Sequence, residues 1–507
     1  MAELKIHAAT GIQTYSVQTG KLLSDILRTC GTNLEMPCGG TGRCGKCRVQ
    51  ITGALSEPSD QERRFLSEQE IAKGIRLACC TRLTGDATVL SIGWEEENSK
   101  ICADGAEIRL GDDPLFHTLG VAVDIGTTTL AASLYSREGL LATSTAPNPQ
   151  RSWGADVISR VGQAIAGESH ALADIIRQAI SGLMHDLCSQ ADKPCQSIDA
   201  VVITGNTAML HLLTCTDPSP LAASPFKAKE LFGKNLKASD LQLPCAPDAI
   251  VHLPRCISAF VGADIVTAIL SSGLTEAPET SLLADIGTNG EIVLWDKGKL
   301  TCCSTAAGPA FEGANLSHGM QGKDGAIDRV SVCNGKLHFH TLGGKPAIGI
   351  CGSGVADLLA ALLQLEILDE TGLLDDGDED EWPLEGDVTF TQGDVRQVQL
   401  AKSAIRSGIE TLIKKSKLVH SGIRTLFIAG GFGSYLSLDS AAAIGLIPPA
   451  LKGVCKVIGN AALSGAAMIL WDQTLRDRCR EQADQATTVE LATDPFFMDQ
   501  YIENMMF

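Results

Sequence analysis

The sequence predicts a multidomain α/β protein, with a small cysteine-rich domain at its N-terminus followed by a larger, two-lobed α/β core. Three observations lead to this prediction. At 507 residues the chain is long enough for three or four domains of ordinary size. Three closely spaced cysteines follow two short alternating segments near its start. A strand–glycine–strand unit then occurs twice, at the spacing of whole domains.

Composition and charge limit the classes of partner. Hydrophobic residues make up 44% and charged residues 20% of the chain, which is typical of a globular protein. The net charge of −19 argues against nucleic acid or an anionic membrane surface as a partner. No apolar run is long enough for a transmembrane helix, and the first residues lack the apolar core of a signal peptide. We therefore expect a cytoplasmic protein.

The sequence contains eighteen cysteines without an export signal, which favours metal binding, catalysis or burial over disulfides. Cys38, Cys44 and Cys47 lie in MPCGGTGRCGKCR, and Cys79 or Cys80 follows in LACCTRL. Three thiolates on one loop with a distant fourth suit a [2Fe–2S] cluster, because each iron takes two cysteines. The intervening glycines favour a tight loop whose N–H groups face the sulfurs. Zinc is the alternative, although zinc sites usually pair two short cysteine knuckles.

The segments around these cysteines indicate the fold of the small domain. Residues 3–8 and 12–17 alternate like a hairpin, residues 21–30 have a helical pattern, and CRVQITG and ATVLSIG are strand-like. This order, with five residues between the first two cysteines, resembles the β-grasp fold of [2Fe–2S] ferredoxins of the adrenodoxin and putidaredoxin group. The resemblance implies that Cys79, in an L-x-C segment, is the fourth ligand, with Cys80 as the open alternative.

Two copies of a strand–DIGT–strand unit, GVAVDIGTTTLAASLY and LLADIGTNGEIVLW, form an internal repeat. Glycine allows a tight turn whose backbone N–H groups face an anion, and hydroxyl and amide side chains donate hydrogen bonds to phosphate oxygens. An aspartate at the strand end can hold Mg²⁺, usually through water. The candidate residues are Asp124, Gly126, Thr127, Thr128 and Thr129 in the first copy, and Asp285, Gly287, Thr288 and Asn289 in the second.

A third motif, FIAGGFGSYL, follows a buried strand. Its glycines, Gly430, Gly431 and Gly433, allow the backbone to approach a flat ligand such as adenosine. Two further acids are candidates to position an attacking water. Glu291 follows the second DIGT turn, where a solvated strand glutamate is the alternative interpretation. Glu312 lies in GPAFEG, where the alternative is a helix-capping or structural role.

In this order the three motifs resemble the phosphate-1, phosphate-2 and adenosine loops of the actin/hexokinase/Hsp70 (ASKHA) superfamily of ATPases. The resemblance implies two α/β lobes that close over ATP and Mg²⁺. We expect residues 119–281 to form the first lobe and 282–507 the second. Helices at 260–270 and 459–470 are expected to cross between the lobes, because their small residues permit close approach.

The motifs also indicate how the chain before residue 119 is divided into domains. We expect residues 1–94 to form the ferredoxin-like domain and residues 95–118 to form a polar linker. The combination of the two parts resembles the reductive activators of corrinoid enzymes over nearly the whole chain. NPQRSWGADVISRV, GNTAMLHLL, STAAGPAFEGANLSHGM and IGICGSGVADLLA are among the segments that carry this likeness.

The resemblance implies an ATP-hydrolysing iron–sulfur enzyme that re-reduces inactive cob(II)alamin to cob(I)alamin in a corrinoid protein of anaerobic methyl transfer. Its [2Fe–2S] cluster would pass the electron, an external low-potential donor would supply it, and a homodimer is compatible with the family. Three alternatives stay open. They are an ASKHA-type small-molecule kinase with a redox-sensing domain, an activator of a radical dehydratase, and an electron-transfer module that binds ATP without turnover.

Overall fold

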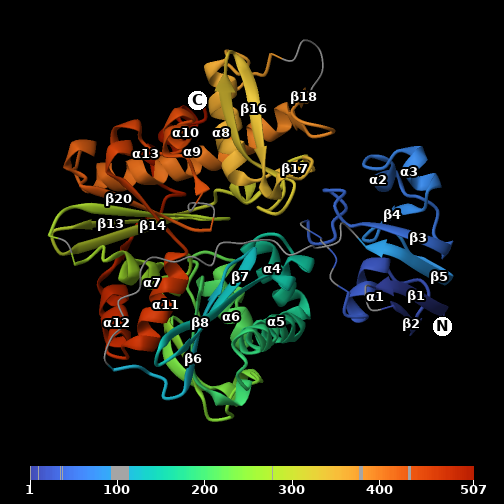
Figure 1. The fold of residues 1–507 in the computed structure, drawn as a ribbon, viewed down its shortest axis with the longest axis horizontal. Coiled ribbons are helices and arrows are strands. Elements are labelled where there is room, and N and C mark those ends of the chain that lie inside the picture. The colour runs from blue at the N-terminus through green and yellow to red at the C-terminus, as the bar shows by residue number, and fades with distance from the viewer. Residues whose placement is uncertain are drawn as a thin grey trace.

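The computed structural model describes residues 2–8, 11–32, 34, 36, 38–92, 113–276, 278–375, 381–431 and 435–507. Figure 1 shows a small N-terminal domain, in blue, beside a larger body made of two lobes, one above the other. Among the described residues, no helix has both the length and the apolar character needed to span a membrane.

The small domain is a mixed five-stranded sheet in the order β2-β1-β5-β3-β4. Strand β1 pairs antiparallel with β2 and parallel with β5, and the buried side of α1 packs against the sheet. This arrangement is the β-grasp fold predicted from the sequence. Its elements are β1 (Ala2–Ala8), β2 (Gly11–Val17), α1 (Leu23–Thr29), β3 (Arg48–Leu55), α2 (Asp60–Arg63), α3 (Glu68–Ala72), β4 (Ile75–Leu77) and β5 (Leu83–Ile92).

The first lobe contains a six-stranded sheet in the order β10-β11-β9-β6-β7-β8. The first DIGT unit forms the antiparallel pair β6–β7, and β9 lies parallel to β6 on its other side. The elements are β6 (Leu119–Ile125), β7 (Thr129–Ser136), β8 (Gly139–Pro147), α4 (Val157–Gln163), α5 (Ser169–Ala191), β9 (Ile198–Gly205), α6 (Thr207–Thr214), β10 (Phe232–Lys237), β11 (Ile250–Arg255) and α7 (Ala263–Ser272).

The second lobe repeats this plan in a sheet of order β21-β20-β12-β13-β14-β22. The second DIGT unit is the antiparallel pair β12–β13, and β20 lies parallel to β12. The main elements are β12 (Ser281–Ile286), β13 (Gly290–Asp296), β14 (Lys299–Thr305), α8 (Gly352–Gln364), α9 (Gln392–Lys415), β20 (Thr425–Ala429), α10 (Leu438–Ala443), β21 (Cys455–Gly459), β22 (Thr487–Thr488) and α13 (Pro495–Glu503). A smaller sheet of β15 (Ala326–Cys333), β16 (Lys336–Thr341) and β17 (Gly349–Ile350) and a hairpin of β18 (Glu381–Pro383) and β19 (Thr389–Thr391) extend this lobe.

Two helices cross between the sheets, α7 and α11 (Ala461–Trp471). A Cβ atom placed on Gly465 of α11 would lie 2.0 Å from the backbone oxygen of Thr267 on α7. The close crossing therefore requires glycine, as the small residues of both segments predicted.

Two helices that follow β21 of the second sheet in the chain pack against strands of the first lobe. Helix α11 packs against β6 and β9, and α12 (Leu475–Gln485) packs against β11 of the first lobe. The reason is that α11 is apolar nearly all round, so it needs cover from both sheets rather than from one. Helices α11 and α12 thus contact strands of the first lobe although they follow most of the second lobe's strands in the chain.

Candidate functional site

The cysteine loop joins α1 to β3 and turns on glycines. Gly39, Gly40, Gly42 and Gly45 have φ values of 60°, 82°, 72° and 64°, in the left-handed region that other residues avoid. The loop therefore bends tightly at four places between its first and third cysteines. At Gly45 a side chain would also collide with the ring of Phe65, since a Cβ atom would lie 2.9 Å from it.

The four predicted cysteines meet as two pairs. The sulfurs of Cys47 and Cys79 lie 3.3 Å apart, close to the ~3.8 Å expected for two thiolates on one tetrahedral metal with 2.3 Å bonds. The side chains of Cys38 and Cys44 are hydrogen-bonded to each other. No three histidine, cysteine or carboxylate side chains within the described ranges are gathered for a single ion. Two pairs fit two irons better than one zinc.

The environment of Cys38 favours the thiolate that iron requires. Burial alone would raise the pKa of this thiol. Hydrogen bonds from the backbone of Arg43, the side chains of Thr41 and Cys44, and the backbone of Gly42 outweigh that effect and lower the pKa to about 6. The backbone of Arg43 and of Gly42 therefore acts to lower the pKa of this thiol.

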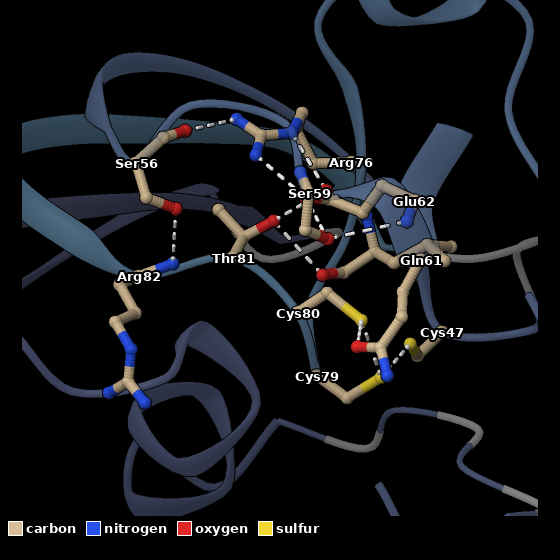
Figure 2. A network of polar contacts seen from close by, with 11 residues as sticks. Cys47, Ser56, Ser59, Gln61, Glu62, Arg76, Cys79, Cys80, Thr81 and Arg82 are labelled. Atoms are coloured by element: carbon tan, nitrogen blue, oxygen red, sulfur yellow. Dashed lines mark hydrogen bonds and ion pairs between the residues drawn. The ribbon is translucent and has the colours of Figure 1, made fainter. Parts of the chain in front are cut away.

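A buried polar network holds the segment that carries the fourth cysteine (Figure 2). The carboxylate of Glu62 is fully buried and accepts hydrogen bonds from Arg76 Nε at 2.8 Å and Thr81 Oγ1 at 2.9 Å. The backbone N–H of Leu77 donates to the same carboxylate at 3.2 Å. Since these partners stand on both sides of Cys79 in the chain, they fix its position opposite the loop.

The second candidate site is a cleft between the lobes, where the two DIGT turns face each other. All but one of the predicted nucleotide-binding residues line it, and Gly433 lies outside the described residues. The lining residues predicted from the sequence are Asp124, Gly126, Thr127, Thr128, Thr129, Asp285, Gly287, Thr288, Asn289, Glu291, Glu312, Gly430 and Gly431.

The threonines of the two turns share one acceptor. The Oγ1 atoms of Thr128 and Thr288 lie 3.3 Å apart, and both hydroxyls donate to Oε2 of Glu312, that of Thr288 at 2.9 Å. The carboxylate oxygen thus occupies the kind of position that a phosphate oxygen takes between two hydroxyl donors. Burial raises the pKa of Glu312, while the two hydroxyl groups act in the opposite direction.

Four other carboxylates gather at the strand ends. Burial raises the pKa of Asp124 to about 6 and that of Asp285 to about 7, the latter with a contribution from the charge of Asp124. For Asp264, at the start of α7, burial and the charges of Asp124 and Asp285 raise the pKa to about 8. Burial and the charges of Asp264 and Asp285 raise the pKa of Glu291 as well. Burial and these charges together disfavour full ionisation of the four carboxylates.

The third motif passes directly over the end of β12. Gly430 has a φ of 101°, and a Cβ atom there would lie 2.5 Å from the backbone oxygen of Ile286 and 2.9 Å from Oδ1 of Asp285. Glycine is therefore required for the two motifs to meet. At the start of α11, Asn460 Nδ2 donates to Oδ2 of Asp124 at 3.0 Å. This hydrogen bond links the N-terminus of α11 to the strand that precedes the first DIGT turn.

Several residues in or beside the cleft were not predicted from the sequence. Asp264 lies in FVGADIVTAIL, a segment noted only for its small residues, although an acid at a helix start was a usable signal. Asn206 caps α6 and donates to Thr127 Oγ1 at 3.2 Å. Arg160 is fully buried and its Nη2 donates to the backbone oxygen of Thr127 at 2.6 Å. No local pattern marked Arg160, because its partner lies 33 residues away.

Three family models match consecutive parts of the chain. The 2Fe-2S iron-sulfur cluster binding domain matches residues 8–84, the RACo middle region matches 119–277, and the C-terminal domain of RACo, the ASKHA domain, matches 279–507. The matched parts correspond to the small domain and to the chain that forms the cleft.

Relatives of known name resemble the chain over most of its length. The corrinoid activation enzyme RamQ of Eubacterium limosum is 30% identical, over 97% of this chain and 97% of its own. The Co(II) methylated amine-specific corrinoid protein reductase of Methanosarcina barkeri is 26% identical, over 76% of each chain. A solved structure of a reductive activator for corrinoid, iron-sulfur protein is 27% identical and superimposes with a TM-score of 0.71, covering 100% of this chain and 98% of the other.

Proposed function

The chain belongs to the RACo family of ATP-dependent reductive activators of corrinoid proteins, and from this premise we propose its reaction in detail. It re-reduces cob(II)alamin to cob(I)alamin in a corrinoid protein of a methyltransferase system. ATP is hydrolysed in the cleft between the lobes. The whole-chain match favours this activity over the kinase and dehydratase-activator alternatives. The proposal depends on one observation: the same chain has a site with paired cysteines and a cleft in which two phosphate-loop turns face each other.

The two DIGT turns bind the phosphates of ATP in this proposal. The hydroxyl groups of Thr128 and Thr288 face one acceptor between the lobes, and a phosphate oxygen can take that place. Donors from both lobes on one phosphate group hold the lobes together, so ATP favours the closed cleft. The turn at Gly430 and Gly431 leaves room for the adenosine at the other end of the cleft.

We further propose that Asp124, Asp264 and Asp285 hold Mg²⁺ through its bound waters. Burial raises the pKa of all three carboxylates, the charge of Asp124 adds to this at Asp285, and the charges of both add to it at Asp264. A divalent cation would offset the burial and the repulsion. Water-mediated binding fits the described residues, among which no three such side chains converge directly on one ion. When bound, Mg²⁺ supplies charge neutralisation on the transferred phosphate.

The attacking water requires a carboxylate acceptor near the phosphate. Asp264 and Glu291 are our candidates, since each lines the cleft without being engaged by the two phosphate-loop threonines. Glu312 has a different role in the nucleotide-free protein, because its carboxylate already accepts from both of those threonines. We therefore assign Glu312 to control of the phosphate site rather than to the water.

The residues of the small domain serve the electron transfer. Cys38 and Cys44 hold one iron of a [2Fe–2S] cluster, and Cys47 and Cys79 hold the other. The cluster supplies the one-electron carrier. Loop N–H groups at Cys38 stabilise negative charge on sulfur, and the Glu62 network keeps Cys79 in place. We propose that an external low-potential donor reduces this domain and that the reaction takes place in the cytoplasm, where free thiolates persist.

An anaerobic assay tests the proposal. The reconstituted protein is mixed with a corrinoid protein in the cob(II) state, a low-potential reductant and Mg-ATP, and cob(I)alamin is followed by its visible absorption. We expect ATP-dependent cob(I)alamin that is lost in both Cys44→Ala and Asp285→Ala. ATP turnover and an intact cluster without any cob(I)alamin would contradict the proposal. A phosphorylated small molecule in place of inorganic phosphate would point to a kinase instead.

A further inference from the structure

The ferredoxin-like domain contacts the first lobe at Trp153 and at its neighbour Ser152. The guanidinium group of Arg28, on α1, stacks over the ring of Trp153 with its carbon 4.8 Å from the ring centre. Arg28 Nη2 also donates to the backbone oxygen of Ser152 at 3.4 Å. On the cluster loop, a Cβ atom at Gly39 would lie 3.2 Å from the backbone oxygen of Trp153. The cluster loop therefore lies directly against this tryptophan.

The same segment is tied to the first phosphate loop. Asn148, fully buried, donates through Nδ2 to the backbone oxygen of Gly126 at 2.8 Å, and its own N–H donates to that of Thr128 at 2.8 Å. Arg160 completes the connection, because Nε donates to Gly154 at 2.8 Å and Nη2 to Thr127 at 2.6 Å. Residues 148–154 thus cannot stay in place if the DIGT turn moves.

The second lobe reaches the same domain from the other side of the cleft. Lys46, on the cluster loop, donates through Nζ to the backbone oxygen of Leu316 at 3.4 Å. Leu316 is buried and lies four residues after Glu312, whose carboxylate accepts from the threonines of both phosphate loops. The contacts at Trp153 and at Leu316 are therefore both made by segments that also hold a phosphate loop.

We propose that these two contacts hold the ferredoxin-like domain against the core in the nucleotide-free protein, and that the γ-phosphate of ATP releases it. The phosphate takes the hydroxyl donors of Thr128 and Thr288 and repels the carboxylate of Glu312. The segment from Glu312 to Leu316 then shifts, and Lys46 loses its acceptor. Arg28 and Trp153 are positioning residues in this scheme, because they set where the cluster lies and touch no reacting atom.

The release gives ATP a means to time the electron transfer. In the docked domain the cluster loop at Gly39 lies against the backbone of Trp153. A released domain can present this side of the loop to a corrinoid protein. The inference rests on the proposed binding of ATP in the cleft. It adds to that function a mobile electron carrier whose position depends on the nucleotide.

The test uses the full-length, reconstituted protein without oxygen. The rate at which an iron chelator bleaches the cluster reports how exposed the loop is, and hydrogen–deuterium exchange of residues 148–163 reports docking from the core side. We expect the non-hydrolysable analogue AMP-PNP with Mg²⁺ to increase both rates, and ADP to leave them near the nucleotide-free values. Binding of AMP-PNP is measured separately by calorimetry.

Variants on both sides of the contact make the test specific. Arg28→Gln should bleach about 2- to 30-fold faster without nucleotide, and Trp153→Leu, on the other domain, should do the same. The double variant should bleach no faster than either single one. Arg28→Lys keeps the charge and should restore part of the protection. Arg63→Gln, which removes a surface cation of the same domain, is the matched control and should behave as the wild type.

Three results would overturn the inference, and they are distinguishable. If AMP-PNP binds but changes neither rate, the release is wrong while the proposed ATPase stands. If AMP-PNP does not bind at all, the proposed function fails together with the inference. Additive effects of Arg28→Gln and Trp153→Leu would also overturn it, since they would show that the two residues act on the cluster separately.

Discussion

The hydroxyl oxygens of Thr288, the threonine of the second DIGT turn, and Thr128, which directly follows the threonine of the first, lie 3.3 Å apart across the cleft. Their partner is the carboxylate of Glu312, and we expect a phosphate group to replace it. The two copies of the internal repeat thus place their hydroxyl donors on one acceptor atom.

Thr288→Val should weaken ATP binding about 3- to 10-fold, because a hydrogen bond to a charged phosphate oxygen is lost at nearly constant side-chain volume. The dissociation constant of a fluorescent ATP analogue and the KM for ATP hydrolysis check this. Thr143→Val, on the exposed side of β8, is the matched control and should change neither value. Equal affinities for the Thr288 variant and the wild type would remove the hydroxyl from the phosphate site.

Asp285→Asn should lower the rate of ATP hydrolysis on the order of 100-fold and raise the Mg²⁺ concentration needed for activity. The same change should raise the melting temperature of the nucleotide-free protein, because one of several repelling buried carboxylates disappears. A Mg²⁺ titration of phosphate release and a thermal melt measure the two effects. Asp439→Asn, at an exposed ion pair, should show neither. A loss of activity with a loss of stability would indicate misfolding instead.

The stability of the nucleotide-free protein should fall as pH rises from about 5.5 to 8.5. Asp124, Asp285 and Asp264 have folded pKa values of about 6, 7 and 8, all above the ordinary value. The folded chain thus holds protons that the unfolded chain has released, and this stabilisation is complete at low pH and lost as pH rises through the folded values. Thermal melts along a pH series check the slope, which should be shallower in Asp264→Asn. Mg-ATP should recover most of the loss at high pH.

Cys79→Ser should lose the cluster or shift its electron paramagnetic resonance signal, whereas Cys80→Ser should keep both spectrum and iron content. The reason is geometric, since the sulfur of Cys79 lies 3.3 Å from that of Cys47, while Cys80 Sγ faces Oε1 of Gln61 at 3.8 Å. The two variants differ by one position and act as each other's control. A normal cluster in Cys79→Ser would assign the fourth ligand to Cys80.

Gly465→Ala should destabilise the protein by about 1–3 kcal/mol, because the added methyl group would meet the backbone oxygen of Thr267 at 2.0 Å. The helix crossing between the lobes would have to open. Gly182→Ala, on α5 with free space around it, is the control and should stabilise by about 0.5–1 kcal/mol. Urea unfolding of the two variants gives both values. A tolerated Gly465→Ala would mean that the crossing distance is adjustable.

The local chemistry of the loops could be predicted from the sequence. The spacing of Cys38, Cys44 and Cys47 among glycines predicted a cluster loop, and the glycines of that loop do turn with positive φ. The repeated DIGT letters predicted two similar hairpins, and both are present with a parallel strand beside them. These features depend on residues within a few positions of one another, so a short stretch of sequence is enough to predict them.

The partners across the cleft could not be predicted in this way. Asn460 reaches Asp124 from 336 residues away, and Arg160 reaches Thr127 from a separate helix. Asp264 becomes a site residue only because α7 begins where both DIGT strands end. Helix α11 packs against the first sheet for the same reason, although it follows β21 of the second sheet in the chain. Each of these contacts depends on how separate elements pack, which no local pattern records.

By itself, the sequence determined the tight turns and the cysteine spacing from which we predict the iron- and phosphate-binding residues, because both depend on residues close together in the chain. Only the tertiary structure decided which of them meet. It selected Cys79 over Cys80 as the neighbour of Cys47, and it placed the cluster loop against Trp153 and Leu316. The physical reason is that burial, and the close packing it imposes, brings distant segments to contact distance in one relative orientation.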